Sequence, residues 1–268
     1  KQKTAYEIPK RDWSSDVCSS DLDEAIRRAC EEVLTDAPGR RFVYSDINYL
    51  LLGDIVARVS HQPLQDFVRD RLFEPLGMRD TGFVPRAASL ARTAPTQFCT
   101  PPGPCEGPGM TMLRGVVHDP TARRMGGVAG HAVLFSTASD LATFARMMLG
   151  GGTVDGHRVL SPLSVARMTS AATPAGEPNV RGFGWDIDST YSANRGELLP
   201  LGSYGHTGFT GGSIWIDPAT RLFVVFLSSR LHPDGKGDVT PLRARVASIA
   251  ASSLRSEEHR LNSSHVSE

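Results

Sequence analysis

The stretch "YGHTGFTGGSIWID", residues 204–217, decides the fold. Glycines surround His206 and Thr207, so the backbone there carries few side chains. A backbone kept this bare is expected where another group must approach it closely. The alternation of apolar and polar residues in "SIWID" then predicts a half-buried strand. The segment therefore predicts a strand edge that can receive another molecule.

Strand signals continue on both sides of this stretch. "RGFGWDID" at 181–188 alternates apolar and polar residues, and "RLFVVFLSS" at 221–229 is a continuous apolar run after the turn "PAT". From 237 the sequence predicts a helix with Thr240 as N-cap and Pro241 in its first turn. The residues expected to face the sheet are Leu242, Val246, Ile249 and Leu254.

Helical patterns fill the earlier part of the chain. Residues 23–35 predict one helix, and two apolar stripes after Asn48, separated by Pro63, predict two more. Thr137 with Asp140 three residues later predicts the start of a helix that three glycines end at 150–152. Helices followed by a strand meander and a covering helix indicate the α+β class. We expect the helical part over about 47–180 and the sheet with its C-terminal helix over 181–254.

Composition narrows the classes of function. With 268 residues, 40% of them hydrophobic, the chain can bury a sizeable core as one large domain or two interleaved ones. Its 29 basic and 29 acidic residues, with no long basic run, argue against nucleic acid or an anionic membrane as the main partner. No apolar stretch approaches the roughly 20 residues that span a bilayer. Cys99 and Cys105 bracket "TPPGP", where they can pair or stay as two free thiols.

The two ends fit neither a core helix nor a strand. "SSDVCSSDL" is at 14–22 and "RSEEHRLNSSHVSE" is at 255–268. A nucleotide sequence that encodes "RSEE" has a reverse complement that encodes Ser-Ser-Asp-Leu, the sequence of 19–22, in a shifted frame. Such a mirrored pair is typical of translated sequencing adapter, although two unrelated polar tails are the alternative. We expect 1–22 and 255–268 to be non-native and 23–254 to be the natural domain.

Four motifs follow one another in a fixed order. They are "VYSDINYLLLGDIVARVS", "LFEPLGMRDTGF", "GGVAGHAVLFSTASDLATFARMML" and "GHTGFTGGSIWIDP". Together they resemble the serine β-lactamase and penicillin-binding-protein family, in its class C-like branch, which includes DD-peptidases and esterases. The resemblance covers about 40–254. It implies a β-lactamase/transpeptidase-like α+β fold from which the N-terminal part is missing.

The resemblance also implies a chemistry, which is acyl transfer through a seryl acyl-enzyme on a small ester or amide. In this family a Ser-x-x-Lys pair supplies the nucleophile and its proton acceptor, and a Tyr-x-Asn motif supplies a phenol that passes protons to the leaving group. A Lys-Thr-Gly or His-Thr-Gly motif on an edge strand holds the substrate. By resemblance Tyr44 and His206 are catalytic. The substrate-binding residues are then Asp46, Thr207, Gly208 and Phe209, the last through a backbone N–H aimed at the acyl oxygen.

Two exchanges within these motifs bear on the substrate. Asp46 stands where the family has Asn, so a carboxylate replaces a neutral amide and would repel an anionic substrate. His206 stands where Lys is common, and a histidine is only partly charged at neutral pH. Both exchanges favour ester hydrolysis over recognition of β-lactams or D-Ala-D-Ala.

Tyr44 needs a cationic neighbour if it is to act as a base. A tyrosine with its ordinary pKa of about 10 is a poor base at neutral pH, so a cationic neighbour must lower that pKa. We expect His206, protonated or donating a hydrogen bond, to be this neighbour and also to anchor the substrate.

The stretch 118–131 is interpreted as a loop that borders the cleft. It contains His118, Asp119 and His131, but neither a helical histidine pair nor a cysteine cluster accompanies them. No metal and no cofactor are therefore predicted.

The nucleophile motif is missing. Lysine occurs only at positions 1, 3, 10 and 236, and none of these has a serine three residues before it. In the family this motif precedes the Tyr motif, where this chain has the adapter-like segment. We expect a truncated serine hydrolase that is inactive as supplied. The alternative is a non-catalytic pseudoenzyme or binding module of the same fold.

Overall fold

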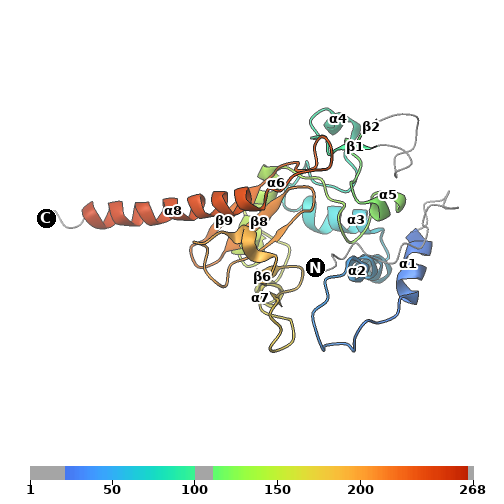
Figure 1. Ribbon diagram of the computed structural model, residues 1–268, viewed down its shortest axis with the longest axis horizontal. Coiled ribbons are helices and arrows are strands. Elements are labelled where there is room, and N and C mark those ends of the chain that lie inside the picture. The colour runs from blue at the N-terminus through green and yellow to red at the C-terminus, as the bar shows by residue number, and fades with distance from the viewer. Residues whose placement is uncertain (1–21, 100–110, 265–268) are drawn as a thin grey trace.

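A five-stranded antiparallel sheet lies at the centre of the fold, in the order β5-β6-β7-β8-β9. The structure is a computed structural model and describes residues 22–99 and 111–264 (Figure 1). Sheet and helices together confirm the predicted α+β class. The five strands are β5 (Val180–Arg181), β6 (Asp186–Asp188), β7 (Tyr204–Thr207), β8 (Ser213–Asp217) and β9 (Leu222–Phe226).

Strand β8 explains how the sheet is buried on both faces. Successive side chains of a strand point to opposite faces. Ile214 and Ile216 therefore belong to the larger hydrophobic cluster, whereas Trp215 belongs to a smaller cluster on the other side. The alternation predicted from "SIWID" thus corresponds to a strand that is covered on both faces, not on one.

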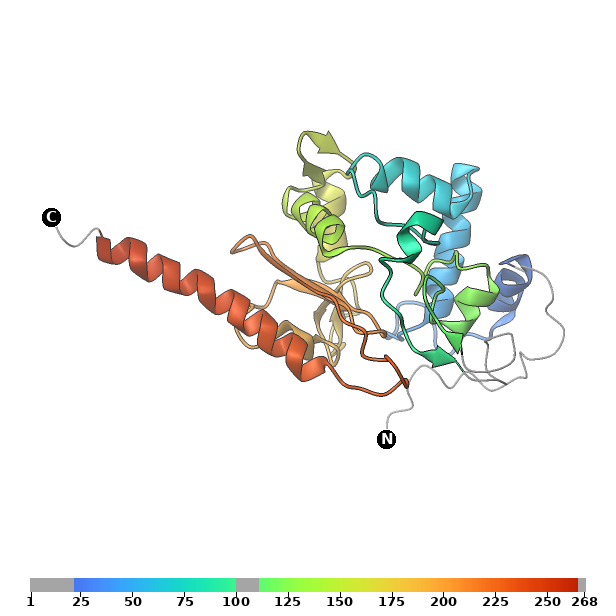
Figure 2. The same cartoon turned by 90° about the horizontal axis from the view of Figure 1, so that it is seen from above.

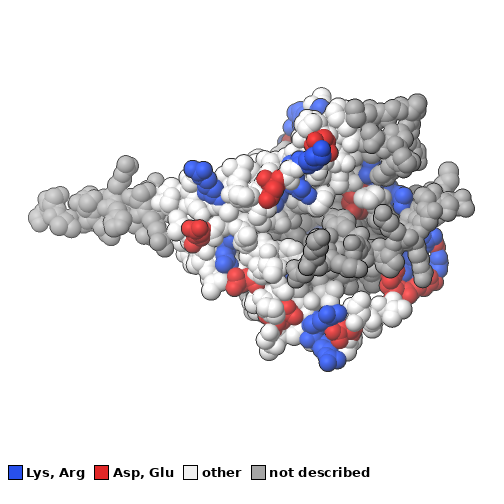
Figure 3. All heavy atoms as spheres, viewed as in Figure 1, with Lys and Arg blue, Asp and Glu red and all other residues white. Residues whose placement is uncertain are grey.

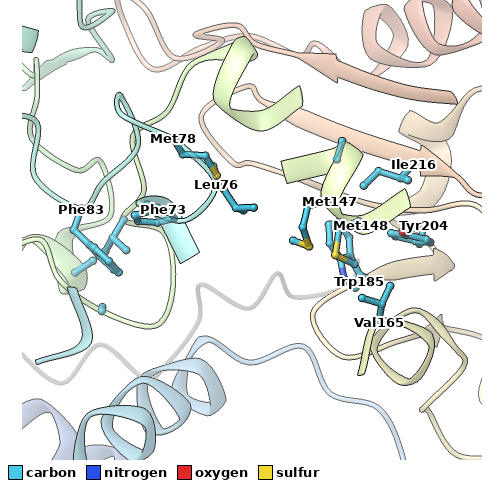
Figure 4. Packing of buried hydrophobic residues seen from close by; sticks show 14 of the residues in the cluster. Phe73, Leu76, Met78, Phe83, Met147, Met148, Val165, Trp185, Tyr204 and Ile216 are labelled. Atoms are coloured by element: carbon cyan, nitrogen blue, oxygen red, sulfur yellow. The ribbon is translucent and has the colours of Figure 1, made fainter. Parts of the chain in front are cut away.

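Helix α6 (Ala138–Leu149) covers the first face of the sheet. Thr137 caps it as predicted, because its hydroxyl oxygen accepts a hydrogen bond from the backbone N–H of Asp140 at 3.2 Å. The helix ends where the three glycines begin, also as predicted. Met147 and Met148 are buried and point toward Tyr204 and Trp185 (Figure 4). Helix and sheet therefore share one core.

Helix α8 (Thr240–Ser264) covers the second face and projects beyond the rest of the protein (Figure 2). Its buried positions are Arg243, Ala247 and Ala251, spaced at four residues along one side. The predicted contacts of Leu242 and Ile249 are wrong, since these side chains are 51% and 59% exposed. Small alanines fit closely against Trp215, so the helix turns this side, and not its bulkier one, to the sheet.

Two helix lengths differ from the predictions. Helix α8 continues ten residues past the predicted end at 254, because "RSEEHRLN" contains good helix formers and neither glycine nor proline. Helix α1 (Leu22–Glu31) stops short of the predicted 35, and Val33 and Leu34 beyond it are exposed. Because these two apolar side chains do not pack against the core, no burial stabilises a longer helix.

The helical part packs against the sheet from one side (Figure 1). Its second predicted helix is α2 (Asp46–Ser60), and the third is divided into α3 (Leu64–Val68) and a π-helical turn, η1 (Arg69–Phe73). The remaining elements are short: α4 (Ala87–Leu90), β1 (Phe98–Cys99), β2 (Thr111–Met112), α5 (Pro120–Arg124), β3 (Thr153–Val154), β4 (His157–Arg158), α7 (Pro162–Thr169) and the 3-10 turn η2 (Ser192–Arg195).

The described surface carries both signs of charge. Basic and acidic side chains are interspersed on the face drawn in Figure 3. Among the residues that the structure describes, no helix is long and apolar enough to cross a membrane. Cys105 and the side chain of Cys99 lie outside the described residues, so their pairing stays a prediction.

Candidate active site

The glycine-rich turn after β7 is held by its own backbone. The N–H of Gly208 donates to the carbonyl of Gly212 at 2.7 Å, and the N–H of Gly211 donates to the carbonyl of Gly208 at 3.1 Å. The φ of Gly211 is +135°, in a region that side chains disfavour. A Cβ on Gly205 would clash with the Ile214 carbonyl and the Trp215 ring. Gly208 is exposed, and a Cβ there would make only ordinary contacts, at 3.7 Å, with the backbone of Gly212, so of Gly205, Gly208 and Gly211 it is the one that leaves the edge accessible.

A buried arginine from α8 fixes this turn from behind. Arg243 is 6% exposed, and its guanidinium donates to the carbonyl of Gly208 at 2.9 Å and to that of Gly211 at 3.1 Å. A third donor reaches Oδ1 of Asn194 at 3.4 Å. A guanidinium holds five N–H donors in a fixed planar fork, so this one buried side chain can donate to several acceptors at once.

A second arginine holds the middle of the turn. The backbone N–H of Arg230 donates to the carbonyl of Thr210 at 2.9 Å, and its Nε donates to the carbonyl of Phe209 at 2.5 Å. Its guanidinium also lies 4.3 Å from the centre of the Phe209 ring, and the His118 ring lies 5.5 Å from the same ring. All carbonyls from 208 to 211 therefore accept hydrogen bonds from within the protein.

The structure brings the two predicted catalytic residues together. Tyr44 lies on an extended segment just before α2, and the centre of its ring is 6.4 Å from that of His206 on β7. The Tyr191 ring lies 5.4 Å from Tyr44 on another side. Thr207, Gly208 and Phe209 continue the chain from His206, so the predicted substrate-binding edge starts at this pair.

Sequence reasoning missed the cation of this site, Arg181. Its guanidinium carbon lies 5.5 Å from the centre of the Tyr44 ring, and the rings of Phe42 and Tyr191 lie at 5.4 and 5.8 Å. Arg181 pairs with Asp186 at 3.4 Å, and both side chains are buried. The alternation in "RGFGWDID" predicts one strand, whereas the structure divides the segment between β5 and β6, which pair antiparallel and set Arg181 opposite Asp186.

Burial governs the titration of Tyr44 and His206. Burial first, and the carboxylate of Asp46 second, raise the pKa of Tyr44, although Arg181 opposes this. Burial also lowers the pKa of His206, and Arg181 adds to this effect, although the hydrogen bond to the Thr207 carbonyl opposes it. The expectation that a protonated His206 lowers the pKa of Tyr44 is therefore wrong. The cation beside Tyr44 is Arg181, and the lowered pKa of His206 favours its neutral imidazole at neutral pH.

The tautomer of His206 follows from one contact. Nδ1 lies 2.8 Å from the carbonyl oxygen of Thr207, which can only accept, so Nδ1 carries the proton. In the neutral ring Nε2 is then the acceptor. His206 can thus receive a proton or a hydrogen bond through Nε2 without moving.

Asp46 begins α2 and is partly buried. Burial raises the pKa of Asp46, and Asp119 adds to this while His131 opposes it. The charge of Asp46 acts on Tyr44, so this predicted substrate-binding residue lies beside the predicted catalytic pair.

A largely apolar cavity of about 1080 Å³ adjoins the turn. Of the predicted site residues, Gly208 lines it, together with His118 from the stretch 118–131. The other walls come from the helical part and from the segment after β9, and include Val117, Phe135, Leu141 and Leu227. An acyl chain that approaches Gly208 would have this space beside it.

Comparison with known proteins matches the chain to one family. The Beta-lactamase family model matches residues 4–248, a range that includes part of the segment predicted to be non-native. A protein of Escherichia coli (strain K12) described as "Putative D-alanyl-D-alanine carboxypeptidase" is 33% identical over 235 residues. A protein of the same description from Salmonella schwarzengrund is 31% identical. The aligned region is 84% of this chain but 54% of either relative, so the chain spans about half their length.

Solved structures agree in fold. Simvastatin synthase (LovD) from Aspergillus terreus aligns with a TM-score of 0.62 at 18% identity, over 86% of this chain and 61% of that one. A penicillin-binding protein homologue from Caulobacter crescentus aligns with a TM-score of 0.61 at 19% identity, over 87% and 64% of the two chains. These likenesses show the β-lactamase/transpeptidase fold.

Replacing Arg243 tests whether it holds the turn. We expect Arg243→Met to keep the buried stem but remove the guanidinium donors from the carbonyls of Gly208 and Gly211, lowering the free energy of unfolding by about 2–4 kcal/mol. Urea unfolding measures this loss, and amide exchange at 208–212 should rise. Arg245→Met, at an exposed position on the same helix, is the control and should change neither quantity. Equal effects of the two substitutions would contradict the role of Arg243.

Burial of a neutral His206 predicts a pH dependence of stability. The pKa of His206 is lowered from 6.5 in the folded protein, so the unfolded chain takes up this proton first as the pH falls. The contribution of the neutral His206 to the free energy of unfolding is therefore complete above about pH 6.5 and is lost as the pH drops toward the pKa of His206 in the folded protein. Urea unfolding at pH values from about 5 to about 8, the range in which histidine titrates, should show this slope. His206→Gln should reduce the slope and the exposed control His61→Gln should keep it, so equal slopes in all three would contradict the assignment.

Proposed function

Because the chain belongs to the β-lactamase family of serine hydrolases, we propose that it carries the substrate-receiving side of an acyl-transfer site for uncharged esters or amides. One observation carries this proposal, which is the placement of Tyr44 against His206 at the start of a turn held by two arginines. Tyrosine, imidazole and a fixed backbone edge are the parts that acyl transfer needs besides its nucleophile.

Each part has a role in the proposed reaction. The serine hydroxyl attacks the acyl carbon, and the backbone N–H of Phe209 donates to the oxygen that becomes negative. Tyr44 passes the serine proton to the leaving group, with Nε2 of His206 as an acceptor beside it. The arginines that hold the carbonyls of the turn keep the donor from reorienting, which supports preorganised stabilisation of the transition state.

The charges of the site support an uncharged acyl substrate. His206 replaces a lysine and is neutral, because burial lowers its pKa. Arg181 is engaged by Asp186 and by aromatic rings, and Asp46 adds a carboxylate. This arrangement provides little positive charge to bind a substrate carboxylate, so we favour ester hydrolysis.

A second candidate is DD-carboxypeptidase activity. It is favoured by the 33% identity to a protein whose description names D-alanyl-D-alanine carboxypeptidase. It requires recognition of a terminal carboxylate, which the neutral His206 supports less well than a lysine would.

The nucleophile is proposed to come from sequence that this chain does not contain. None of its four lysines follows a serine by three residues, so the 268 residues hold no Ser-x-x-Lys pair. We propose that the natural sequence ahead of Tyr44 supplies the pair, and that the chain as supplied is inactive. A pseudoenzyme of the same fold is the alternative, and it requires that the natural sequence also lack the pair.

Covalent labelling tests this proposal. A fluorophosphonate probe should leave the present chain unlabelled, whereas a chain that includes the natural sequence ahead of Tyr44 should be labelled at the serine of a Ser-x-x-Lys pair. In that longer chain, Tyr44→Phe should lower kcat for p-nitrophenyl esters by a factor of about 100 or more. Tyr191→Phe, which alters the neighbouring ring, is the matched control and should retain most activity.

Substrates separate the candidates. The longer chain should hydrolyse p-nitrophenyl esters faster than nitrocefin or a D-Ala-D-Ala peptide. Faster release of D-alanine would favour the carboxypeptidase instead. Labelling of any serine in the present chain, or of none in the longer one, would contradict the proposal that the nucleophile lies in the natural sequence ahead of Tyr44.

A further inference from the structure

A buried arginine lies among three aromatic rings beside the candidate site. The guanidinium carbon of Arg181 is 5.4 Å from the centre of the Phe42 ring, 5.5 Å from that of Tyr44 and 5.8 Å from that of Tyr191. These three rings form what we call the aromatic cage. Only 5% of Arg181 is exposed, so little water screens its charge from the cage. A desolvated cation attracts aromatic rings, and here it attracts rings from two distant segments of the chain.

A fixed carboxylate holds this guanidinium in place. The antiparallel pairing of β5 and β6 sets Arg181 opposite Asp186, and Nη1 of Arg181 lies 3.4 Å from Oδ1 of Asp186. Asp186 is 2% exposed and also accepts hydrogen bonds from the hydroxyls of Ser189 at 2.6 Å and Ser192 at 3.0 Å. A buried ion pair whose carboxylate has these further donors is well satisfied. The position of the guanidinium therefore follows from the sheet and not from the segment that carries Tyr44.

The segment that carries Tyr44 is tied to the same part of the molecule. The backbone N–H of Phe42 donates to Oε2 of Glu177 at 3.3 Å. Glu177 also accepts from the side-chain amide of Asn179 at 3.1 Å, directly before β5. Within 22–99 and 111–264, the hydrogen bonds include none to the Tyr44 hydroxyl. The cage therefore holds Tyr44 by its ring and leaves its oxygen available for the reaction.

Arg181 is also the neighbour that favours a negative charge on Tyr44. The titratable and charged groups around Tyr44 are Asp46, Tyr49, Arg181, Tyr191 and His206. Burial first, and the carboxylate of Asp46 second, raise the pKa of Tyr44, and the two neighbouring tyrosines add to this. Arg181 opposes all of them. Burial favours the neutral form of His206, so its imidazole adds no positive charge.

We propose that Arg181 is a positioning residue for acyl transfer, which fixes the Tyr44 ring through the aromatic cage and stabilises negative charge on the Tyr44 oxygen. It acts through Tyr44 and does not itself contact the substrate. Because Asp186 holds the guanidinium at the cage, Arg181 is not free to turn toward a substrate carboxylate.

This inference rests on the proposed function, in which Tyr44 gives its proton to the leaving group and takes the serine proton in exchange. Between the two transfers the phenol oxygen keeps the electron pair of the broken O–H bond and is a phenolate. A cation 5.5 Å from the ring centre lowers the free energy of that phenolate, whereas a neutral His206 does not. The positive charge that helps this proton transfer thus comes from β5 and not from the motif at 206–208.

A fluorine NMR titration of the present chain tests the effect of this charge. Tyr44 is replaced by 3,5-difluorotyrosine, whose phenol ionises at lower pH than that of tyrosine, so the protein need not be taken to strongly alkaline pH. We expect Arg181→Met to raise the pKa of the fluorinated phenol, and Arg181→Lys, which keeps the charge, to raise it less. Arg167→Met is the matched control, because Arg167 lies 4.8 Å from the centre of a ring outside the cage, that of Phe183. It should leave the pKa of the fluorinated phenol unchanged.

Unfolding curves show whether each variant is folded. If Arg181→Met is not, its combination with Asp186→Asn removes both charges of the buried pair, and the same rise in the pKa of the fluorinated phenol is expected.

Kinetics of the longer chain test the consequence for the reaction. Arg181→Met should lower kcat for p-nitrophenyl esters about tenfold or more and leave KM nearly unchanged, and Arg181→Lys should recover part of the loss. An unchanged pKa of the fluorinated phenol or an unchanged kcat in the folded variant would refute the role of Arg181, as would an equal rise in pKa in Arg167→Met. Serine labelling of the longer chain does not depend on Arg181, so it would still uphold the proposed function.

Discussion

The site depends on one buried interaction, the guanidinium of Arg243 among backbone carbonyls of the glycine-rich turn. The turn carries few side chains, so donors from outside it add to the hydrogen bonds within its own backbone. Arg243 extends from the helix that covers the sheet, and therefore couples the packing of α8 to the position of Phe209. A guanidinium stays charged in proteins, so burying it requires the several acceptors that the turn provides.

The rest of the site follows from this fixed edge. With β7 in place, His206 meets Tyr44, and Arg181 lies against the same tyrosine from the neighbouring hairpin. Burial then decides the charges, because it keeps His206 neutral and Tyr44 protonated. The result is a receiving surface with little positive charge of its own and a carboxylate, Asp46, at its border.

What the sequence predicted correctly was set by local patterns. The Thr137 cap, the glycine stop after α6 and the strand "SIWID" depend on neighbours a few residues away. What it missed depends on contacts between distant segments. The side of α8 that packs on the sheet is set by Trp215, and the cation beside Tyr44 comes from a hairpin more than a hundred residues later. Motif order placed Tyr44 and His206 together, but it carried no information on their charge.

The central claim is that Tyr44, His206 and the turn that begins at Gly208 form the receiving side of a serine acyl-transfer site. A crystal structure of the longer chain after reaction with a phosphonate ester tests it most directly. The account predicts a bond from phosphorus to the serine of a Ser-x-x-Lys pair, one phosphoryl oxygen about 2.7–3.1 Å from the N–H of Phe209, and the Tyr44 hydroxyl facing the leaving-group position. A phosphonate bound away from this edge, or one whose oxygen meets other donors, would contradict it.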